Sequence, residues 1–179
     1  MRKVFYMMGI LNDEDLEWLV VHGVTRSVHS GTVIIRENEM IDSIYILLDG
    51  KLSVVSARLG REVARLDCGE ILGEISFVDS RLPSASVIAL ENTSLLAISR
   101  DTLNAKLSKD DGFAARFYRA VGAFLADRLR SAVGQMGYEA VRKETAEADE
   151  LDDAWMENVS FAASRFDQLL KRLGVDHPA

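Results

Sequence analysis

Cysteine, proline and positive charge are scarce in this sequence. Among 179 residues there are one cysteine and two prolines, and 21 lysines and arginines stand against 28 aspartates and glutamates. The lone Cys68 cannot close an internal disulfide, and it is typical of a packed thiol in a reducing compartment. The net charge of -7 disfavours nucleic acid as a partner, because clustered positive charge supplies most of the affinity for phosphate backbones.

Long apolar runs and targeting segments are also missing. No run approaches the roughly 20 apolar residues that a transmembrane helix needs. The opening MRKVFYMMGILNDEDLEWL lacks a small-residue cleavage site after its short apolar stretch. Hydrophobic residues make up 48% and charged residues 27%, a composition that favours a compact domain with a real core. We therefore expect a cytoplasmic protein, made of one domain and an appendage, with no membrane as partner.

Residue clusters that would support catalysis or bind a metal do not stand out. His22, His29 and His177 are scattered, without the spacing of metal ligands. No Gly-x-Ser-x-Gly elbow, Walker loop or His-Glu-x-x-His pattern occurs. The sequence therefore predicts a protein that is not an enzyme and that has no resident metal or cofactor.

Short β-branched segments follow one amphipathic helix in the first hundred residues. Asn12 and the carboxylates after it predict a capped helix with Leu16, Leu19 and Val20 on one face. Strand-like segments then recur about every 8 to 12 residues, the rhythm of a sandwich or barrel. They are TVIIR, SIYILL, KLSVV, EVARL, ASVIAL and SLLAIS. The pair Asp49-Gly50 predicts a tight hairpin turn, and the segment Arg58-Leu59-Gly60-Arg61 predicts a second one.

After Ser99 the sequence predicts helix. Leu103 and Leu107 lie on one face of a first helix that follows this cap. The segment 113–133 carries apolar residues with a period of about 3.6, which predicts one long amphipathic helix. Gly134 and Gly137 interrupt this pattern, so we place the end of the helix before them.

An acidic connector and a final helix complete the chain. Residues 144–153 are acidic and weakly apolar, and the stripe from Leu151 to Leu173 has helical spacing with Gly174 as a stop. Trp155 and Phe166 are the large side chains of this stripe. The stripe either fills a groove of a partner protein or docks on the β domain or the long helix of its own chain.

Residues 69–89, GEILGEISFVDSRLPSASVIA, form the most informative segment. A glycine lets the backbone turn sharply, and a short helical turn that starts near Glu74 directs free N–H groups outward. These amides could hold an anion, and the carboxylate of Glu74 could accept hydrogen bonds from sugar hydroxyls. A plain surface turn between two strands explains the same spacing.

From about Leu11 to Val133 the sequence resembles the cyclic nucleotide-binding domain. The resemblance rests on a leading helix, short strands with an Asp-Gly turn, a Gly-Glu-rich cassette, a Ser-Ala-Ser-Val strand and a long closing helix. It implies a mainly β plus α fold, a β-roll or jelly-roll of about eight strands flanked by helices, with a C-terminal helical extension. Residues 1–133 would form the domain, and residues 134–179 the connector and the C-terminal helix.

The resemblance also implies a ligand site. Gly73 and Glu74 match the Gly-Glu of the family cassette, in which the Glu binds the ribose 2′-hydroxyl and the amides bind the cyclic phosphate. Ala85 and Val87 match the last two fixed positions of the family's Arg-x-Ala-x-Val, and Ser84 falls at its variable position. The ligand-binding residues implied are Gly73, Glu74, Ile75, Ser76, Arg81, Ser84, Ala85, Ser86 and Arg128.

One departure from the family pattern bears directly on this site. Pro83 stands where the family carries arginine, and it offers neither a charge nor a backbone N–H. Losing one charge-assisted hydrogen bond costs about 1.5–3 kcal/mol. Arg81 either swings in as a substitute or remains in solvent, and Arg128 either reaches over the pocket or is a solvated helix residue. Asn38 replaces a usual family glycine but tolerates the left-handed conformation.

These observations predict a non-catalytic regulatory module that senses a cyclic nucleotide, cAMP or cGMP, and signals through its C-terminal helices. The alternative is a protein-interaction or scaffold subunit that kept the fold and lost the ligand. A partner protein, or a second copy in a homodimer, would bind through the helices Phe113–Val133 and Leu151–Leu173. No nucleic acid is expected, because the residues that follow Val133 are acidic.

Overall fold

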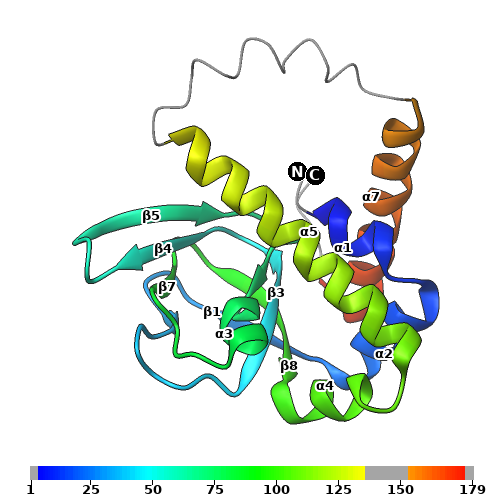
Figure 1. Cartoon of the computed structure of the whole chain (residues 1–179), viewed down its shortest axis with the longest axis horizontal. Helices are drawn as coiled ribbons and strands as arrows, with labels where there is room; N and C mark the ends of the chain where they lie inside the picture. The colour runs from blue at the N-terminus through cyan, green and yellow to red at the C-terminus, as the bar shows by residue number, and fades with distance from the viewer. Residues whose placement is uncertain (1–3, 136–152, 176–179) are drawn as a thin grey trace.

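A computed structural model describes residues 4–135 and 153–175 of the chain. Within these residues, two antiparallel sheets of four strands each form a β-roll, and helices pack along one side of it (Figure 1). The strands are β1 (Val24–Val28), β2 (Val33–Ile35), β3 (Ser43–Asp49), β4 (Leu52–Ser56), β5 (Arg61–Leu66), β6 (Ile71–Leu72), β7 (Ser86–Ala89) and β8 (Thr93–Ser99). The helices are α1 (Val4–Ile10), α2 (Asp13–His22), α3 (Glu74–Asp79), α4 (Arg100–Leu107), α5 (Asp111–Gln135) and α7 (Asp153–Leu173). The predicted β-roll with flanking helices is confirmed.

The strand order corrects one prediction about the turns. One sheet runs β1-β8-β3-β6 and the other β2-β7-β4-β5, so β3 and β4 belong to different sheets. The turn at Asp49-Gly50 therefore joins the two sheets, and the hairpin predicted there is wrong. Gly50 does adopt a positive φ of 96°. Turn chemistry specifies that backbone angle, but it does not specify which strand becomes the partner. The second predicted hairpin, between β4 and β5, is confirmed by their antiparallel pairing.

β3 is buried on both faces because a hydrophobic core lies on each side of it. Ile44, Ile46 and Leu48 face the helices, whereas Tyr45 and Leu47 face the space between the sheets. The period of two in strand side chains divides the residues in this way. A strand with two buried faces reads as a continuous apolar run, which is how SIYILL appears in the sequence.

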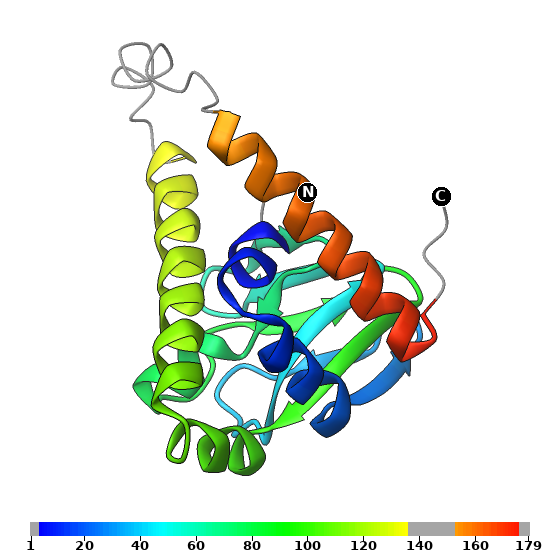
Figure 2. The same cartoon turned by 90° about the vertical axis from the view of Figure 1, so that its right-hand side faces the viewer.

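Three short elements, β1, β6 and α1, were not predicted from the sequence. The residues of β1, VTRSV, are mostly exposed, so the strand lacks the apolar alternation of the others. β6 has only two residues, and it is held by pairing with β3. α1 packs against both α5 and α7 (Figure 2). Each of these elements is stabilised by a neighbour distant in sequence, which no local pattern announces.

The predicted cap of α2 is confirmed, and the long helix is attached to it. The side chain of Asn12 accepts a hydrogen bond from the Asp15 amide at 2.8 Å, and the carboxylate of Asp15 accepts one from the Asn12 amide at 2.9 Å. Arg116 of α5 donates to the same carboxylate from Nε at 2.6 Å and from Nη2 at 2.8 Å. Asp15 is buried, and its ion pair holds the start of α2 against α5.

α7 docks within the chain, against α1 and α2 (Figure 2). Its buried side chains include Ala162, Phe166, Leu169 and Leu170, which belong to the same core cluster as Met7 and Met8 of α1. This arrangement selects docking within the chain, although the sequence analysis had named the β domain and the long helix as docking surfaces. The predicted stop at Gly174 is confirmed by its positive φ of 66°.

The predicted domain boundary between residues 133 and 134 stays a prediction, whereas the helix end predicted there is wrong. Gly134 lies inside α5, which ends at Gln135, so this glycine does not interrupt the helix. Gly137, Leu151 and the connector up to residue 152 lie outside the described residues, as does the side chain of Trp155.

Candidate functional site

The cassette of residues 69–89 folds as β6, the short helix α3 and a loop that leads into β7. α3 begins at Glu74, as predicted, directly after Gly73. Gly73 has a φ of +83°, and a Cβ atom there would lie 2.7 Å from Cδ1 of Ile41 and 3.3 Å from the carbonyl oxygen of Ser43. A side chain at position 73 would therefore strain the backbone and collide with β3 and the loop before it.

A cleft of about 340 Å³ lies beside α3, between the cassette and α5. Its walls combine apolar side chains of both sheets with a few charged and hydroxyl groups, the mixture that small-molecule sites show. The lining residues are Ile35, Val54, Leu66, Leu72, Gly73, Glu74, Ile75, Ser76, Asp79, Arg81, Leu82, Pro83, Ser84, Ala85, Val87 and Arg128. Every residue predicted for the site is among them except Ser86.

Arg128 fastens α5 to the cassette. Its Nη1 donates to Oε1 of Glu74, and its Nη2 donates to the carbonyl oxygen of Ile71 at 3.1 Å. The same Nη2 lies 3.6 Å from Oε2 of Glu70. The side chains of Glu70 and Glu74 are 3% and 2% exposed, and that of Arg128 is 25% exposed. Two buried carboxylates thus share one guanidinium group, which reaches over the cleft instead of standing in solvent.

Burial raises the pKa of Glu74 above the ordinary value for a glutamate. Desolvation is the main cause, and the nearby carboxylate of Glu70 adds to it. The positive charge of Arg128 and a backbone hydrogen bond act in the opposite direction without cancelling it. A hydroxyl group from a ligand would add an uncharged donor to this carboxylate.

Pro83 lies in the wall of the cleft, and its backbone is hydrogen-bonded to a residue outside the cleft. It is buried, and its carbonyl oxygen accepts a hydrogen bond of 2.9 Å from the Asn38 amide. Asn38 has a φ of 62°, the left-handed conformation expected where the family carries glycine. Arg81 lines the mouth of the cleft, but its side chain is 87% exposed and its Nε lies 3.9 Å from Oδ2 of Asp79. In this structure Arg81 stays at the surface.

The serines of the cassette have different surroundings. Ser76 is buried, and its carbonyl oxygen accepts a hydrogen bond of 3.1 Å from Nη2 of Arg100. Ser84 is exposed at the edge of the cleft. Oγ of Ser86 accepts a hydrogen bond of 3.0 Å from the Glu37 amide, so this hydroxyl supports the neighbouring loop.

Sequence reasoning missed Glu70, Arg100 and the apolar walls of the cleft. Glu70 could have been found, because it precedes Glu74 by four residues in a repeated Gly-Glu pattern. Arg100 gave no such signal. Its guanidinium lies 5.3 Å from the centre of the Phe77 ring and holds α3 against α4, a contact between residues far apart in the sequence.

The residues that line this cleft, Arg128 excepted, lie within the part of the chain that matches a known family. Residues 25–110 match the family model of the cyclic nucleotide-binding domain. This part of the chain, which includes the cassette, is similar to cyclic nucleotide-binding domains. A crystal structure of a cyclic nucleotide-binding domain from Methylobacillus flagellatus has a TM-score of 0.66 at 20% identity, and the match covers 75% of this chain and 82% of that chain.

Two curated relatives that match this chain are longer proteins. The cyclic AMP receptor protein of Thermus thermophilus is 29% identical over 144 residues, which are 77% of this chain and 65% of that protein. Lysophospholipase nte1 of Aspergillus fumigatus is 25% identical over 130 residues, which are 71% of this chain and 8% of that protein. This chain therefore spans 65% of the length of the receptor protein and 8% of the length of the lysophospholipase.

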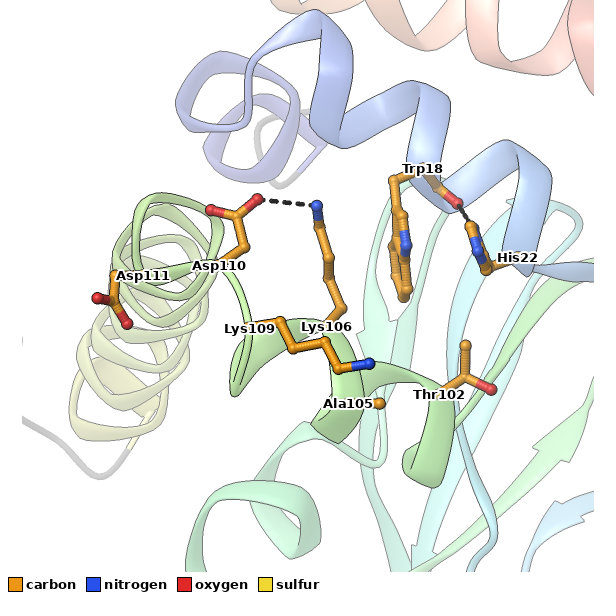
Figure 3. Close-up of a pocket in the computed structure, with 8 residues that line it drawn as sticks. All are labelled: Trp18, His22, Thr102, Ala105, Lys106, Lys109, Asp110 and Asp111. Carbon is orange, nitrogen blue, oxygen red and sulfur yellow. Dashed lines mark hydrogen bonds and ion pairs between the residues drawn. The ribbon is translucent and has the colours of Figure 1, made fainter.

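A larger hollow lies on the other side of the helices, outside the matched cassette (Figure 3). It has a volume of about 730 Å³ and lies between α2, α4 and the start of α5. Two of its polar side chains are already engaged within the hollow, since Nζ of Lys106 lies 2.8 Å from Oδ2 of Asp110 and Nδ1 of His22 lies 2.9 Å from the carbonyl oxygen of Trp18. The rings of Trp18 and His22 stack at 4.6 Å. We therefore place the functional site of the domain at the cassette.

The described part of the chain lacks two further features. No group of histidine, cysteine, aspartate or glutamate side chains there is arranged to hold a metal ion. No helix among the same residues is both long enough and apolar enough to cross a bilayer.

Proposed function

We propose that this protein is a non-catalytic regulatory module that senses a cyclic nucleotide, or a closely related ribose-containing ligand, in the cassette cleft. The contact between Arg128 and Glu74 carries this proposal. Glu74 is the carboxylate expected to bind ribose, and Arg128 belongs to the long helix that leads toward the C-terminal extension. One side-chain contact therefore connects ligand capture to a helix that can transmit it.

The helices provide a route for a signal. α5 contacts α1, and α1 contacts α7, so a shift of α5 reaches the terminal helix through one intermediate. A ligand whose hydroxyls bind Glu74 and Arg128 together would insert between the two side chains. Their separation would loosen α5 from the cassette and change how α1 and α7 pack. Such a shift requires that the ligand bind one position of α5 more tightly than the other.

The melting temperature with and without millimolar cAMP, cGMP, adenosine and guanosine tests ligand binding. A ligand at 100 times its dissociation constant stabilises the fold by about 2.7 kcal/mol. We expect a shift with at least one of these compounds and its loss in Glu74→Gln. Glu91→Gln, at an exposed position of the turn before β8, is the matched control and should respond as the wild type does. Hydrogen exchange of the α1 and α7 amides with the bound compound then tests the signalling route.

The ligand-free scaffold remains the second candidate because of two observations. Pro83 has neither charge nor amide hydrogen at the family's arginine position, and Arg128 already occupies Glu74. A scaffold predicts the same melting temperature with all four compounds. It also predicts that substitutions in the cleft leave the protein's interactions unchanged.

α5 offers the surface for self-association. Tyr118, Leu125 and Leu129 follow one another at intervals typical of a coiled-coil seam, with Gly122 between the first two. Tyr118 is 47% exposed and Leu129 66% exposed, Leu125 between them is partly buried against the core, and the opposite side of the helix is buried. We place a second copy of the chain on this stripe, which covers apolar surface that the described part of the molecule leaves open.

A further inference from the structure

The charges around the cleft are unfavourable for an anion. Glu74, Asp79, Arg81 and Arg128 line it, and Glu70 lies 3.6 Å behind Arg128. Two carboxylates and two guanidinium groups thus line the cleft, so it offers an anion no excess of positive charge.

A phosphate would meet a carboxylate beside each of the two guanidinium groups. Arg128 binds Glu74 and the carbonyl oxygen of Ile71 and lies close to Glu70, so its donors point at the cassette. Arg81 is directed to solvent beside Asp79. A pairing at this exposed position is screened by water and salt, and it contributes little to affinity.

The wall opposite Glu74 is apolar at the place where a phosphate would need a donor. Pro83 has no N–H, its ring is buried in the wall, and its carbonyl oxygen is held by the Asn38 amide. Swinging this loop to admit a cation would break that hydrogen bond. Val54, Leu66 and Val87 continue the apolar surface around the cleft.

The pair formed by Glu74 and Arg128 suits uncharged hydroxyl groups. A hydroxyl can donate to the carboxylate and accept from the guanidinium at the same time, so vicinal hydroxyls bind such a pair without adding charge. The raised pKa of Glu74 is in line with a group that gains from an added donor. The apolar walls can cover a flat ring attached to those hydroxyls.

We propose that the cleft prefers an uncharged nucleoside, bound through its ribose hydroxyls by Glu74 and Arg128, over the corresponding cyclic monophosphate. This inference rests on the proposed function, because it names the ligand class of the same cleft. Pro83 is the residue that determines the specificity: it removes the phosphate partner and leaves the ribose contacts in place.

Isothermal titration of the full chain with adenosine, guanosine, cAMP and cGMP tests this preference. We expect at least one nucleoside to bind about 10-fold or more tightly than its own cyclic monophosphate, which corresponds to the loss of one charge-assisted hydrogen bond. Its affinity should change little between low and high salt, because no net charge enters the cleft.

Pro83→Arg should reverse the order by raising cyclic monophosphate affinity about 10- to 100-fold. Because Pro83 is buried, Ser84→Arg supplies the same cation from the exposed neighbouring position should the first variant fail to fold. Arg58→Ala, at an exposed position of the turn between β4 and β5, is the control, and it should leave nucleoside affinity unchanged.

Tighter binding of cAMP or cGMP than of either nucleoside by the wild type would overturn the inference and leave the proposed function standing. The inference also fails if neither arginine variant gains affinity for a cyclic monophosphate. Absence of binding by all four compounds at millimolar concentration would overturn both the inference and the proposed function.

Discussion

At the scale of single residues, the most unusual feature is the pair of carboxylates around Arg128. Glu70 and Glu74 are both buried, and Glu74 is the one whose pKa burial raises. Burying a charge is costly unless it is fully paired, and for Glu74 the desolvation outweighs the pairing with Arg128. The ligand-free domain therefore gives up some stability to keep a carboxylate ready in the cleft.

Glu74→Gln should be about as stable as the wild type at pH 7, or more stable. The raised pKa means that folded Glu74 binds a proton more readily than unfolded Glu74, so wild-type stability is lost as the pH rises from about 4.3 through the folded value. Urea unfolding at pH 4, 5.5 and 7 measures this. The advantage of Gln should grow with pH, and a Gln variant that becomes relatively weaker as the pH rises would show that the ion pair with Arg128 outweighs desolvation.

Asp15→Asn should destabilise the fold by about 2 kcal/mol at pH 7. Burial opposes the charge of Asp15, but hydrogen bonds from Arg116 and the Asn12 amide outweigh it and lower the pKa of Asp15. A lowered pKa stabilises the fold above the unfolded value of about 3.9, and this contribution is lost as the pH falls through the folded value. Denaturation curves of the two proteins should therefore converge below about pH 4.

Glu14→Gln is the matched control for this experiment. Glu14 lies in the same first turn of α2 but is exposed, so its loss of charge should cost no more than a few tenths of a kcal/mol. Equal losses in both variants would mean that the helix dipole, and not the pair with Arg116, accounts for the effect of Asp15.

At the scale of elements, α7 is held to α1 by a buried arginine. Nη1 of Arg165 donates to the carbonyl oxygens of Met8 and Leu11, the former at 2.5 Å, and Nη2 lies 2.8 Å from Oδ1 of Asp13. Carbonyls at a helix C-terminus lack partners within the helix, so Arg165 supplies donors that α1 needs. α1 and α7 therefore depend on each other, and α1 connects both to α5.

Arg165→Met should lower stability by about 2–3 kcal/mol, because it leaves buried carbonyls without donors. Limited proteolysis should also cleave α7 earlier than in the wild type. Arg172→Met is the control: its ion pair with Glu17 is half-exposed and should contribute at most about 1 kcal/mol. If both variants unfold at the same urea concentration, Arg165 does not hold α7 in place.

At the scale of the whole molecule, we propose that the exposed stripe of α5 holds two copies of the chain together. Leu129→Glu should convert a dimer to a monomer in sedimentation velocity at micromolar concentration, because a charge would be buried at the seam. Arg130→Glu adds a carboxylate one residue away from the stripe and should leave the dimer intact. A wild-type chain that sediments as a monomer at about 100 μM would refute self-association through α5.

Much of this molecule could be predicted from its sequence, because the decisive signals are local. A few consecutive residues and their backbone preferences determine each of these features: the cap at Asn12, the strand segments, the start of α3 at Glu74 and the amphipathic pattern of α5. The left-handed conformation of Asn38 and the glycine at position 73 belong to the same class. Local propensity and periodicity are enough for such features, and the fold class followed from them.

The tertiary structure alone decided which distant groups meet. It placed the Asp49-Gly50 turn between two sheets, α7 on the unpredicted α1, and Arg128 on Glu74 across 54 positions of sequence. It also directed Arg81 to solvent and brought both Glu70 and Glu74 to the guanidinium group of Arg128. Such pairings depend on how helices and sheets pack, and that packing is set by burial summed over the whole chain, not by any short segment.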